Sequence, residues 1–253
     1  MKSLKIALVQ INCPKGEIDR NLAKTADYIN QARNQDVDIV CFPEMSITGY
    51  IKPAKMPKSV LSLDSEPVRR FCELTINTPI TALAGIVERN PDGKPFITQI
   101  VATAGKLQGY YRKVNVAEDE LPTFAPGVDT PIFKHSSLSF GITICADVGH
   151  SKLFEDYAKL GTSTVFAASA PGLYGLQETR NWKSGFNWWR NECRRNLSKF
   201  SKENRINIAV ATQAGRTQDE DFPGGGYVFD NKGNLIASTP DWKEGILYAE
   251  VNT

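Results

Sequence analysis

Three residues of types that can break an amide bond follow stretches with strand character. Glu44 comes after the largely apolar run 37–42, Lys113 closes a run with two tyrosines, and Cys145 ends the β-branched run 141–144. A thiolate is a nucleophile, but a free cysteine thiol with a pKa of about 8.5 is mostly protonated near pH 7. A buried carboxylate can act as its base, and a lysine can stabilise a developing oxyanion. These residue types indicate covalent catalysis through a thioester.

Each of the three residues also has an ordinary interpretation. A glutamate after a strand is often solvated, a strand-end lysine often extends along the surface towards water, and a cysteine after a β-branched run often belongs to the core. The case for chemistry rests on finding all three types in one chain, each at the end of an expected strand. Sheet proteins commonly place their binding groups at such ends.

The histidine and cysteine content narrows the chemistry further. The chain has two histidines, His135 and His150, and neither lies in a motif typical of a cysteine–histidine pair. Its five cysteines are odd in number and form no CxxC pair, so neither a disulfide framework nor a zinc knuckle is expected. We therefore expect a carboxylate as the base for the thiol, and no metal or organic cofactor.

Short strands that alternate with helices are expected to position these residues. Apolar or β-rich runs predict strands at residues 5–11, 37–42, 80–87, 97–103, 106–112, 139–144, 164–168, 206–212, 227–230, 235–238 and 246–251. Helical patterns lie at residues 21–33, 67–76, 152–160 and 182–204, and loops are expected at 117–131 and 171–181. The turn sequence Asn231-Lys232-Gly233-Asn234 predicts a hairpin. This order predicts an α/β architecture with mixed sheets and helices outside.

Several short motifs accompany the three residues along the chain. They are Ala7-Leu8-Val9-Gln10, Pro43-Glu44 with Thr48-Gly49-Tyr50, Tyr111-Arg112-Lys113, Gly141 to Asp147, and Gly224 to Asp230 followed by Gly233. Together they resemble the nitrilase superfamily, also called the carbon–nitrogen hydrolases, over nearly the whole chain. The resemblance implies a four-layer α-β-β-α sandwich, formed by a single domain over residues 1–253. It also implies a catalytic triad of Glu44, Lys113 and Cys145.

A second glutamate between the lysine and the cysteine is also implied by the resemblance. Glu120 fits this position because it stands four residues before Phe124, and Pro126-Gly127 follow; Glu118 is the weaker candidate. The chain departs from the family pattern after the cysteine. Many members carry an arginine and then Pro-Glu there, whereas this chain reads Val148-Gly149-His150-Ser151. The change alters the first turn of the next helix, which bears on the substrate rather than on the triad.

The substrate is expected to be a small polar molecule, held by residues near the triad and by the polar loop 171–181. Five residues are predicted to bind it. These are Tyr50, Ala146, Tyr174, Glu178 and Arg180. The loop also has an ordinary interpretation as solvated surface. The triad suits an amide or an N-carbamoyl compound, and nitrile hydrolysis by the same residues is the alternative.

Composition limits the partners that the protein is expected to have. The formal net charge is +2, and no run approaches the roughly 20 apolar residues of a membrane span, so neither nucleic acid nor a membrane is expected. The N-terminal residues lack the features of a signal peptide, which favours a cytoplasmic protein. The basic residues of 182–204 are interpreted as a solvated helix face. By resemblance, we expect a homodimer or a larger homo-oligomer.

Two other classes of protein remain open from the sequence. A metal-dependent phosphoesterase can share a layered sandwich with a glutamate after an early strand, but it needs several Asp, Asn and His ligands, and this chain has only two histidines. A binding protein that has lost catalysis is the other class, and the three intact triad types argue against it. A chelator separates the first class from a cysteine hydrolase, and a reactive-thiol probe separates the second.

Overall fold

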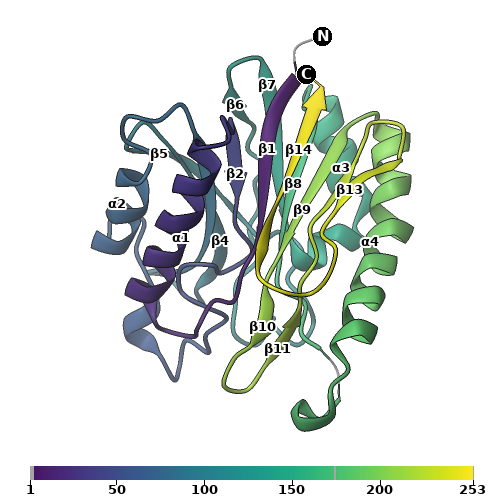
Figure 1. The fold of residues 1–253 in the computed structure, drawn as a ribbon. Helices are drawn as coiled ribbons and strands as arrows, with labels where there is room; N and C mark the ends of the chain where they lie inside the picture. Colours follow the sequence, from purple (N-terminus) through teal and green to yellow (C-terminus); the bar gives the residue numbers. More distant parts are fainter. Residues whose placement is uncertain (1–2, 174, 253) are drawn as a thin grey trace.

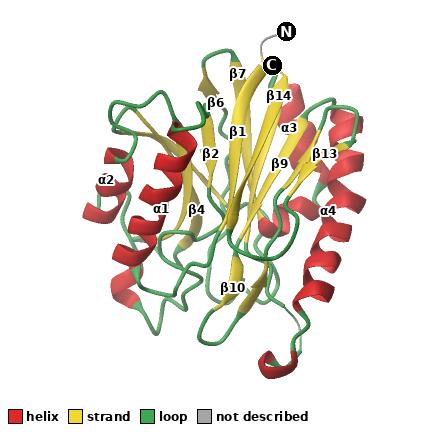
Figure 2. Ribbon diagram, in the orientation of Figure 1, coloured by secondary structure: helices red, strands yellow, loops and turns green. Residues whose placement is uncertain are grey.

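The computed structural model describes residues 3–173 and 175–252. Two six-stranded sheets lie face to face, and a pair of helices covers the outer face of each (Figures 1 and 2). The helices are α1 (Ile18–Arg33), α2 (Glu66–Glu73), α3 (Ser151–Lys159) and α4 (Trp182–Asn204). The predicted four-layer α-β-β-α sandwich is confirmed.

The first sheet packs against α1 and α2 and has the strand order β14-β1-β2-β3-β4-β5. Its strands are β1 (Ser3–Gln10), β2 (Ile39–Cys41), β3 (Thr81–Glu88), β4 (Phe96–Thr103), β5 (Lys106–Arg112) and β14 (Gly245–Asn252). The central strands β1, β2 and β3 run parallel, and the remaining pairs are antiparallel.

The second sheet packs against α3 and α4 and has the strand order β13-β12-β9-β8-β7-β6. Its strands are β6 (Phe133–His135), β7 (Leu138–Ile144), β8 (Thr164–Ser169), β9 (Asn207–Thr212), β12 (Tyr227–Phe229) and β13 (Leu235–Ser238). Here β7, β8 and β9 run parallel, and the outer pairs are antiparallel. Each sheet therefore has a parallel centre between antiparallel edges.

The carboxyl ends of both parallel centres meet at one end of the sandwich. Ile11, just after β1, forms a parallel bridge with Gln213, just after β9. A short hairpin of β10 (Ala214–Arg216) and β11 (Asp221–Pro223) extends beyond this end (Figure 1). Because the parallel strands of both sheets point this way, the residues that follow them are brought together there.

Strand β1 shows how the sequence builds two apolar layers. Its side chains alternate between the two faces of the sheet, as the period of two in a strand requires. Ile6 and Leu8 pack into the core between the sheets, whereas Ala7 and Val9 pack with residues of α1 such as Leu22. Burial on both faces explains why this strand reads as a nearly continuous apolar run.

The long helix α4 is amphipathic. In α4, the buried positions include Trp189, Cys193 and Leu197, which recur at the helical spacing and face the second sheet. The helix starts where the Asn181 side chain accepts a hydrogen bond from the Ser184 N–H, and it ends at Arg205, which adopts a left-handed conformation. None of the described helices is long and apolar enough to cross a membrane.

The predicted elements agree with the structure wherever the pattern is long. The bounds of β5, β13 and α4 are those predicted, and the predicted hairpin turn joins β12 to β13. Helix α1 begins three residues earlier than predicted, and α2 ends at Glu73 rather than at residue 76. The sequence analysis missed β6, β10, β11 and the 3₁₀ helix η2 (Cys145–Gly149) because three to five residues are too short to show a period.

Candidate active site

The segment that carries Glu44 is fixed against the neighbouring strand β3. Its Ile47 N–H donates to the Gly85 carbonyl at 2.9 Å, and the Gly85 N–H donates to Ser46 Oγ at 2.9 Å. Gly85 has no side chain to obstruct this contact: a Cβ there would lie 2.1 Å from the Met45 nitrogen. The backbone of Glu44 is held from the other sheet as well, because Gln213 Nε2 donates to its carbonyl at 2.8 Å.

Lys113 lies buried between two carboxylates. It continues β5, and its N–H donates to the Ile97 carbonyl of β4 at 2.9 Å. Its Nζ is 2.9 Å from Glu44 Oε1 and 2.6 Å from Glu120 Oε2, with 1% of the side chain exposed. Burial alone lowers the pKa of Lys113, but the nearby negative groups, Glu44 foremost, raise it above its ordinary value. The lysine is therefore a fixed cation.

Glu44 is fully buried, and its two oxygens differ in their surroundings. Oε1 accepts from Lys113, whereas Oε2 accepts no hydrogen bond of ordinary geometry. Burial raises the pKa of Glu44 to about 7, while the charge of Lys113 and hydrogen bonding to the Cys145 thiol act in the opposite direction. Oε2 is thus the oxygen left for the thiol, on a carboxylate that can gain or lose a proton near neutral pH.

Cys145 begins η2 where β7 ends, and its backbone makes a sharp turn there. Its φ of 42° lies in the left-handed region, which is uncommon for a residue with a side chain and marks a constrained position. Burial raises the pKa of the thiol well above its ordinary value; Glu44 adds to this effect and Lys113 opposes it. The raised pKa favours the neutral thiol, and a neutral thiol needs a nearby base to take its proton before it can act as a nucleophile.

Asp147 ties this turn to the strand of the lysine. Its carboxylate accepts hydrogen bonds from the Ile144 N–H and the Asn115 N–H, each at 2.8 Å, and from the Tyr111 hydroxyl at 2.7 Å. Because Tyr111 and Asn115 flank Lys113, the same carboxylate fixes the cysteine turn relative to the lysine.

Of the two glutamates considered before the cysteine, the structure places Glu120 in the site. Glu120 is buried, binds Lys113, and accepts a hydrogen bond from the Tyr50 hydroxyl. Glu118 is exposed. The spacing to Phe124 therefore identified the glutamate that contacts the lysine.

A hollow of about 300 Å³ opens above these residues, and we call it the Cys145 pocket. It is lined by Tyr50, Lys113, Ala117, Asp119, Glu120, Cys145, Ala146, Val148, Gly149, Ala170, Pro171, Gly172, Trp188, Trp189, Glu192 and Asn196. A larger hollow, of about 520 Å³, lies at the edge of the first sheet around Arg112 and Phe133, and its lining includes none of the three residues of the predicted triad. The chemistry of the side chains, not the volume, selects the smaller hollow.

The five predicted substrate-binding residues fall into different places. Tyr50 and Ala146 line the Cys145 pocket, whereas Tyr174 lies outside the described residues. Glu178 is exposed in the short helix η3 (Gln177–Thr179), and it is not part of the pocket lining. Arg180 lines a separate hollow, where it pairs with Asp221 at 3.6 Å.

Helix α4 supplies four lining residues that the sequence analysis missed. Trp188, Glu192 and Asn196 recur every four residues, and Trp189 is adjacent. The helix was interpreted as an ordinary covering element with a solvated basic face. The signal that was available is the i, i+4, i+8 spacing of one aromatic and two polar residues, which places them on one face.

Within residues 3–173 and 175–252, no group of three or more His, Cys, Asp or Glu side chains lies close enough to hold a metal ion.

One known protein family matches nearly the whole chain. The sequence model named carbon-nitrogen hydrolase matches residues 5–253. The chain belongs to the carbon–nitrogen hydrolase family. Membership places it among enzymes that act on carbon–nitrogen bonds.

Three proteins that match nearly the whole chain each share less than 30% identity with it. A glutamine-dependent NAD(+) synthetase of Acinetobacter baylyi is 28% identical over 255 residues, which cover 99% of this chain and 44% of the synthetase. The chain thus spans less than half the length of that relative. The structure of a glutamine-dependent NAD+ synthetase from Acinetobacter baumannii matches with a TM-score of 0.83 at 26% identity, covering 99% of this chain and 46% of that one. An amidase from Nesterenkonia sp. matches with a TM-score of 0.81 at 22% identity, covering 98% of this chain and 89% of the amidase, and this similarity concerns the fold.

Proposed function

We propose that this protein hydrolyses the carbon–nitrogen bond of a small polar amide or N-carbamoyl compound, with Cys145 as the nucleophile. The observation that carries the proposal is the buried arrangement of Lys113 between Glu44 and Glu120, beside a cysteine on a constrained turn. Burying a lysine with two carboxylates is costly unless each charge is paired, so such an arrangement is typical of a functional site. Residues of three separate strand ends contribute to it.

The first half of the reaction forms a thioester. The Cys145 sulfur attacks the carbonyl carbon while Oε2 of Glu44 takes the thiol proton, and the carbonyl oxygen becomes negative. Lys113 and the Ala146 N–H, which belongs to the first turn of η2, stabilise that oxygen. The carbon–nitrogen bond then breaks, and Glu44 returns its proton to the departing ammonia or amine. Glu120 holds Lys113 in position.

The second half of the reaction releases the acid. Water attacks the thioester carbonyl and gives a proton to Glu44, and Lys113 again stabilises the oxyanion. The carbon–sulfur bond breaks, and the cysteine sulfur recovers its proton from Glu44. The sum is an amide and water converted to a carboxylic acid and ammonia or an amine. These steps use only protons and charges that the described side chains supply.

An amide is favoured over a nitrile as the substrate. An amide reaches the thioester through one tetrahedral intermediate, and each proton transfer on that path has a partner in Glu44. Nitrile hydrolysis by the same residues remains the alternative, and the two are separated by offering a nitrile and its amide at equal concentration. Higher kcat/KM for the nitrile would contradict the choice.

Glutamine is a second candidate for the amide. The relatives that cover nearly all of this chain include synthetases named as glutamine-dependent, one of which is 28% identical. Glutamine carries a primary amide on a side chain small enough for a hollow of about 300 Å³. Its free ammonium and carboxylate groups would both have to be accommodated near the pocket mouth.

We also propose that two copies of the chain form a homodimer in the cytoplasm. Two-fold pairing is the commonest symmetry of soluble oligomers. Light scattering is expected to give twice the 28.0 kDa mass of one chain at micromolar concentration. A mass of one chain would contradict this part of the proposal and leave the chemistry of the site unaffected.

The direct test of the proposed activity is ammonia release from a panel of small amides, N-carbamoyl compounds and nitriles. We expect at least one amide or N-carbamoyl compound to be turned over by the unmodified chain and by Cys72→Ala, since Cys72 lies on α2 and away from the pocket. Cys145→Ala is expected to be inactive on the same compound. Turnover by Cys145→Ala at the unmodified rate would refute the proposal.

A further inference from the structure

The wall that α4 contributes to the Cys145 pocket is both aromatic and acidic. Trp188, Trp189 and Glu192 project from α4, and Asp119 lies in the loop across the mouth. The two indole rings are 6.0 Å apart and tilted by 42°, and Trp189 is fixed by a 2.9 Å hydrogen bond from its Nε1 to Thr212 Oγ1. Glu192 is half-buried on the next turn of the helix.

The charges of this wall are not balanced inside the pocket. Among the residues in the described ranges, Lys113 is the one cation that lines it, and Lys113 is already neutralised by Glu44 and Glu120. Glu192 pairs with Arg195, which does not line the pocket, so the lining itself carries the negative charges of Glu192 and Asp119. A carboxylate on a substrate would meet these negative groups, and the described lining residues offer it no unpaired cation.

The pocket would hold the two ends of a substrate in different surroundings. The floor holds Cys145 and Lys113, and the buried Oε2 of Glu44, the oxygen left for the thiol, accepts no hydrogen bond of ordinary geometry. The carbonyl must lie against this floor, so the rest of the molecule extends towards the mouth. Ammonium groups are attracted both by carboxylates and by the faces of indole rings.

We propose that the Cys145 pocket selects amides whose non-reacting end carries a cationic amine, with Glu192 as the specificity-determining residue and the indoles of α4 as the surrounding wall. The inference rests on the proposed function for the reacting end only. It favours an amino-alkyl amide over a neutral amide, and over glutamine, whose carboxylate would face the acidic mouth.

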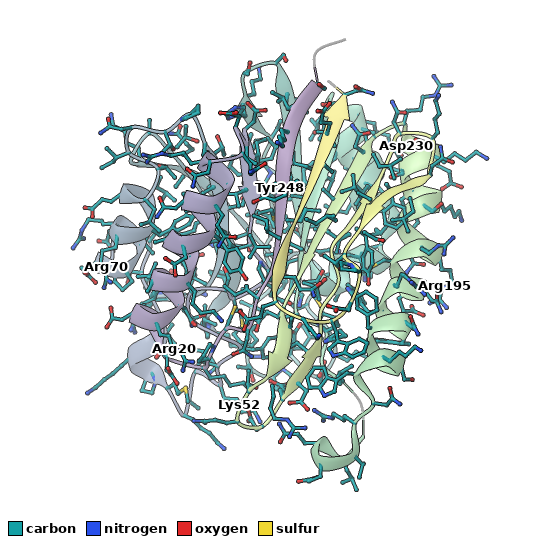
Figure 3. All side chains as sticks on the ribbon, in the orientation of Figure 1. Arg20, Lys52, Arg70, Arg195, Asp230 and Tyr248 are labelled. Carbon is teal, nitrogen blue, oxygen red and sulfur yellow. The ribbon has the colours of Figure 1, made fainter. Side chains whose placement is uncertain are left out.

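The ion pair that Glu192 already makes does not prevent this role. Its partner Arg195 lies one turn further along α4, with 69% of its side chain exposed, and it projects outward from the helix (Figure 3). Exposed ion pairs between i and i+3 residues contribute little to stability, so a ligand ammonium can replace the guanidinium at low cost. The pair also holds the Glu192 carboxylate beside the mouth before a ligand arrives.

The first experiment measures the charge preference of the pocket without turnover. Aminoethyl and sulfonatoethyl methanethiosulfonate each form a mixed disulfide with a thiol and release methanesulfinate, and they differ in the charge they carry. Cys145 is partly exposed whereas the other four thiols are buried, so intact-mass spectrometry follows Cys145. We expect the cationic reagent to react about tenfold faster than the anionic one, after each rate is divided by that for glutathione.

Variants of Glu192 then identify the source of the preference. Glu192→Gln should reduce the ratio of the two rates to within about threefold of that for glutathione, and Glu192→Lys should favour the anionic reagent. Because both rates scale with the same thiolate fraction, a change in the thiol itself cancels in the ratio. Glu203→Gln is the matched control, since it lies on the same helix and pairs only loosely with Lys199, at 3.9 Å. A ratio that is the same in the unmodified protein, Glu192→Gln and Glu192→Lys would overturn the inference.

The second experiment separates this inference from the proposed function. Ammonia release is compared for 3-aminopropanamide, propanamide, succinamate and glutamine. We expect kcat/KM to be highest for 3-aminopropanamide, through a lower KM, and Glu192→Lys to shift the preference to succinamate. Hydrolysis of all four with equal kcat/KM would overturn the inference and leave the hydrolase proposal standing. A charge preference in thiol labelling together with no amide turnover would support the inference at the mouth and reject the proposed reaction.

Discussion

The floor and the wall of the Cys145 pocket differ in how deeply their charged groups are buried and in how these charges are paired. On the floor, Lys113 is buried together with Glu44 and Glu120, and its charge is paired with both carboxylates. On the wall, Glu192 is half-buried and its partner Arg195 is largely exposed. Removing one member of a buried charge pair is costly, whereas an exposed pair contributes little. The comparison teaches that changes at the proposed catalytic residues should also cost stability, whereas changes at the proposed specificity residue should not.

The largest effect is expected at the floor, from Cys145→Ala. The substitution removes the nucleophile, so turnover should fall by at least about 10³-fold. It removes one sulfur atom from a partly exposed position, so the melting temperature should stay within a few degrees of the unmodified protein. Steady-state ammonia release and thermal unfolding together check this, with Cys72→Ala as the thiol control. Comparable losses in both variants would contradict it.

Lys113→Ala is expected to damage both activity and stability. It removes the cation that stabilises the oxyanion, which should cost about 10²–10³-fold in rate. It also leaves the carboxylates of Glu44 and Glu120 buried without their partner, which should lower the free energy of unfolding by about 3–5 kcal/mol. The exposed Lys134 on β6 provides the matched control, and Lys134→Ala should change neither quantity. Urea unfolding that is identical for both variants would show that the floor is not held by charge pairing.

Glu44 should control the dependence of the rate on pH. Its carboxylate must be unprotonated to take the thiol proton, and burial raises its pKa to about 7. We therefore expect kcat/KM to fall as the pH drops below about 7 and to level off above it, until another group titrates. Glu44→Gln should lower the rate by about 10²–10⁴-fold and abolish this acid limb. Glu118→Gln is the control, since Glu118 is exposed, and an acid limb that persists in Glu44→Gln would assign it to another residue.

The sequence was sufficient for most of the floor because Glu44, Lys113 and Cys145 each follow a strand whose pattern is readable. Glu44, Lys113 and Cys145 carry motifs of their own, and the spacing of Glu120 to Phe124 distinguished it from Glu118. What the sequence could not supply is the pairing of distant charges. The contact of Lys113 with Glu44 spans 69 positions and depends on how β2 and β5 lie in one sheet.

The wall was less predictable for a physical reason. Trp188 and Glu192 sit on a helix whose periodicity reports only which face is buried, and nothing in the period shows that one end of that face borders a pocket. The loop 171–181 was emphasised instead because it is polar and close in sequence to the cysteine. In the structure, the Arg180 side chain pairs with Asp221 on β11 and donates to the Gly175 carbonyl at 3.0 Å.

The smallest effect on activity is expected from Arg180→Ala, in the loop 171–181 that precedes α4. Arg180→Ala removes two hydrogen bonds to the Gly175 carbonyl within the loop and the 3.6 Å ion pair with Asp221 of the β10–β11 hairpin, which should cost about 1 kcal/mol in unfolding free energy. The buried Asp221 keeps Arg216 and Gln177 as partners, so the loss stays small. We expect KM to rise a few-fold with kcat unchanged, because the loop and not the floor is loosened. A kcat that falls as much as in Lys113→Ala would break the distinction between floor and wall, and Lys199→Ala on the exposed face of α4 is the control.

The central claim is that the substrate is held on Cys145 as a thioester, and mass spectrometry of the acid-quenched reaction tests it most directly. Acid stops the reaction and preserves thioesters while the protein unfolds. With an amide that is turned over, the tryptic peptide of residues 135–152 should gain the mass of the acyl group, and the gain should disappear on treatment with hydroxylamine. Rapid turnover with no acyl group on this peptide at any time, or with the acyl group on another residue, would contradict the account.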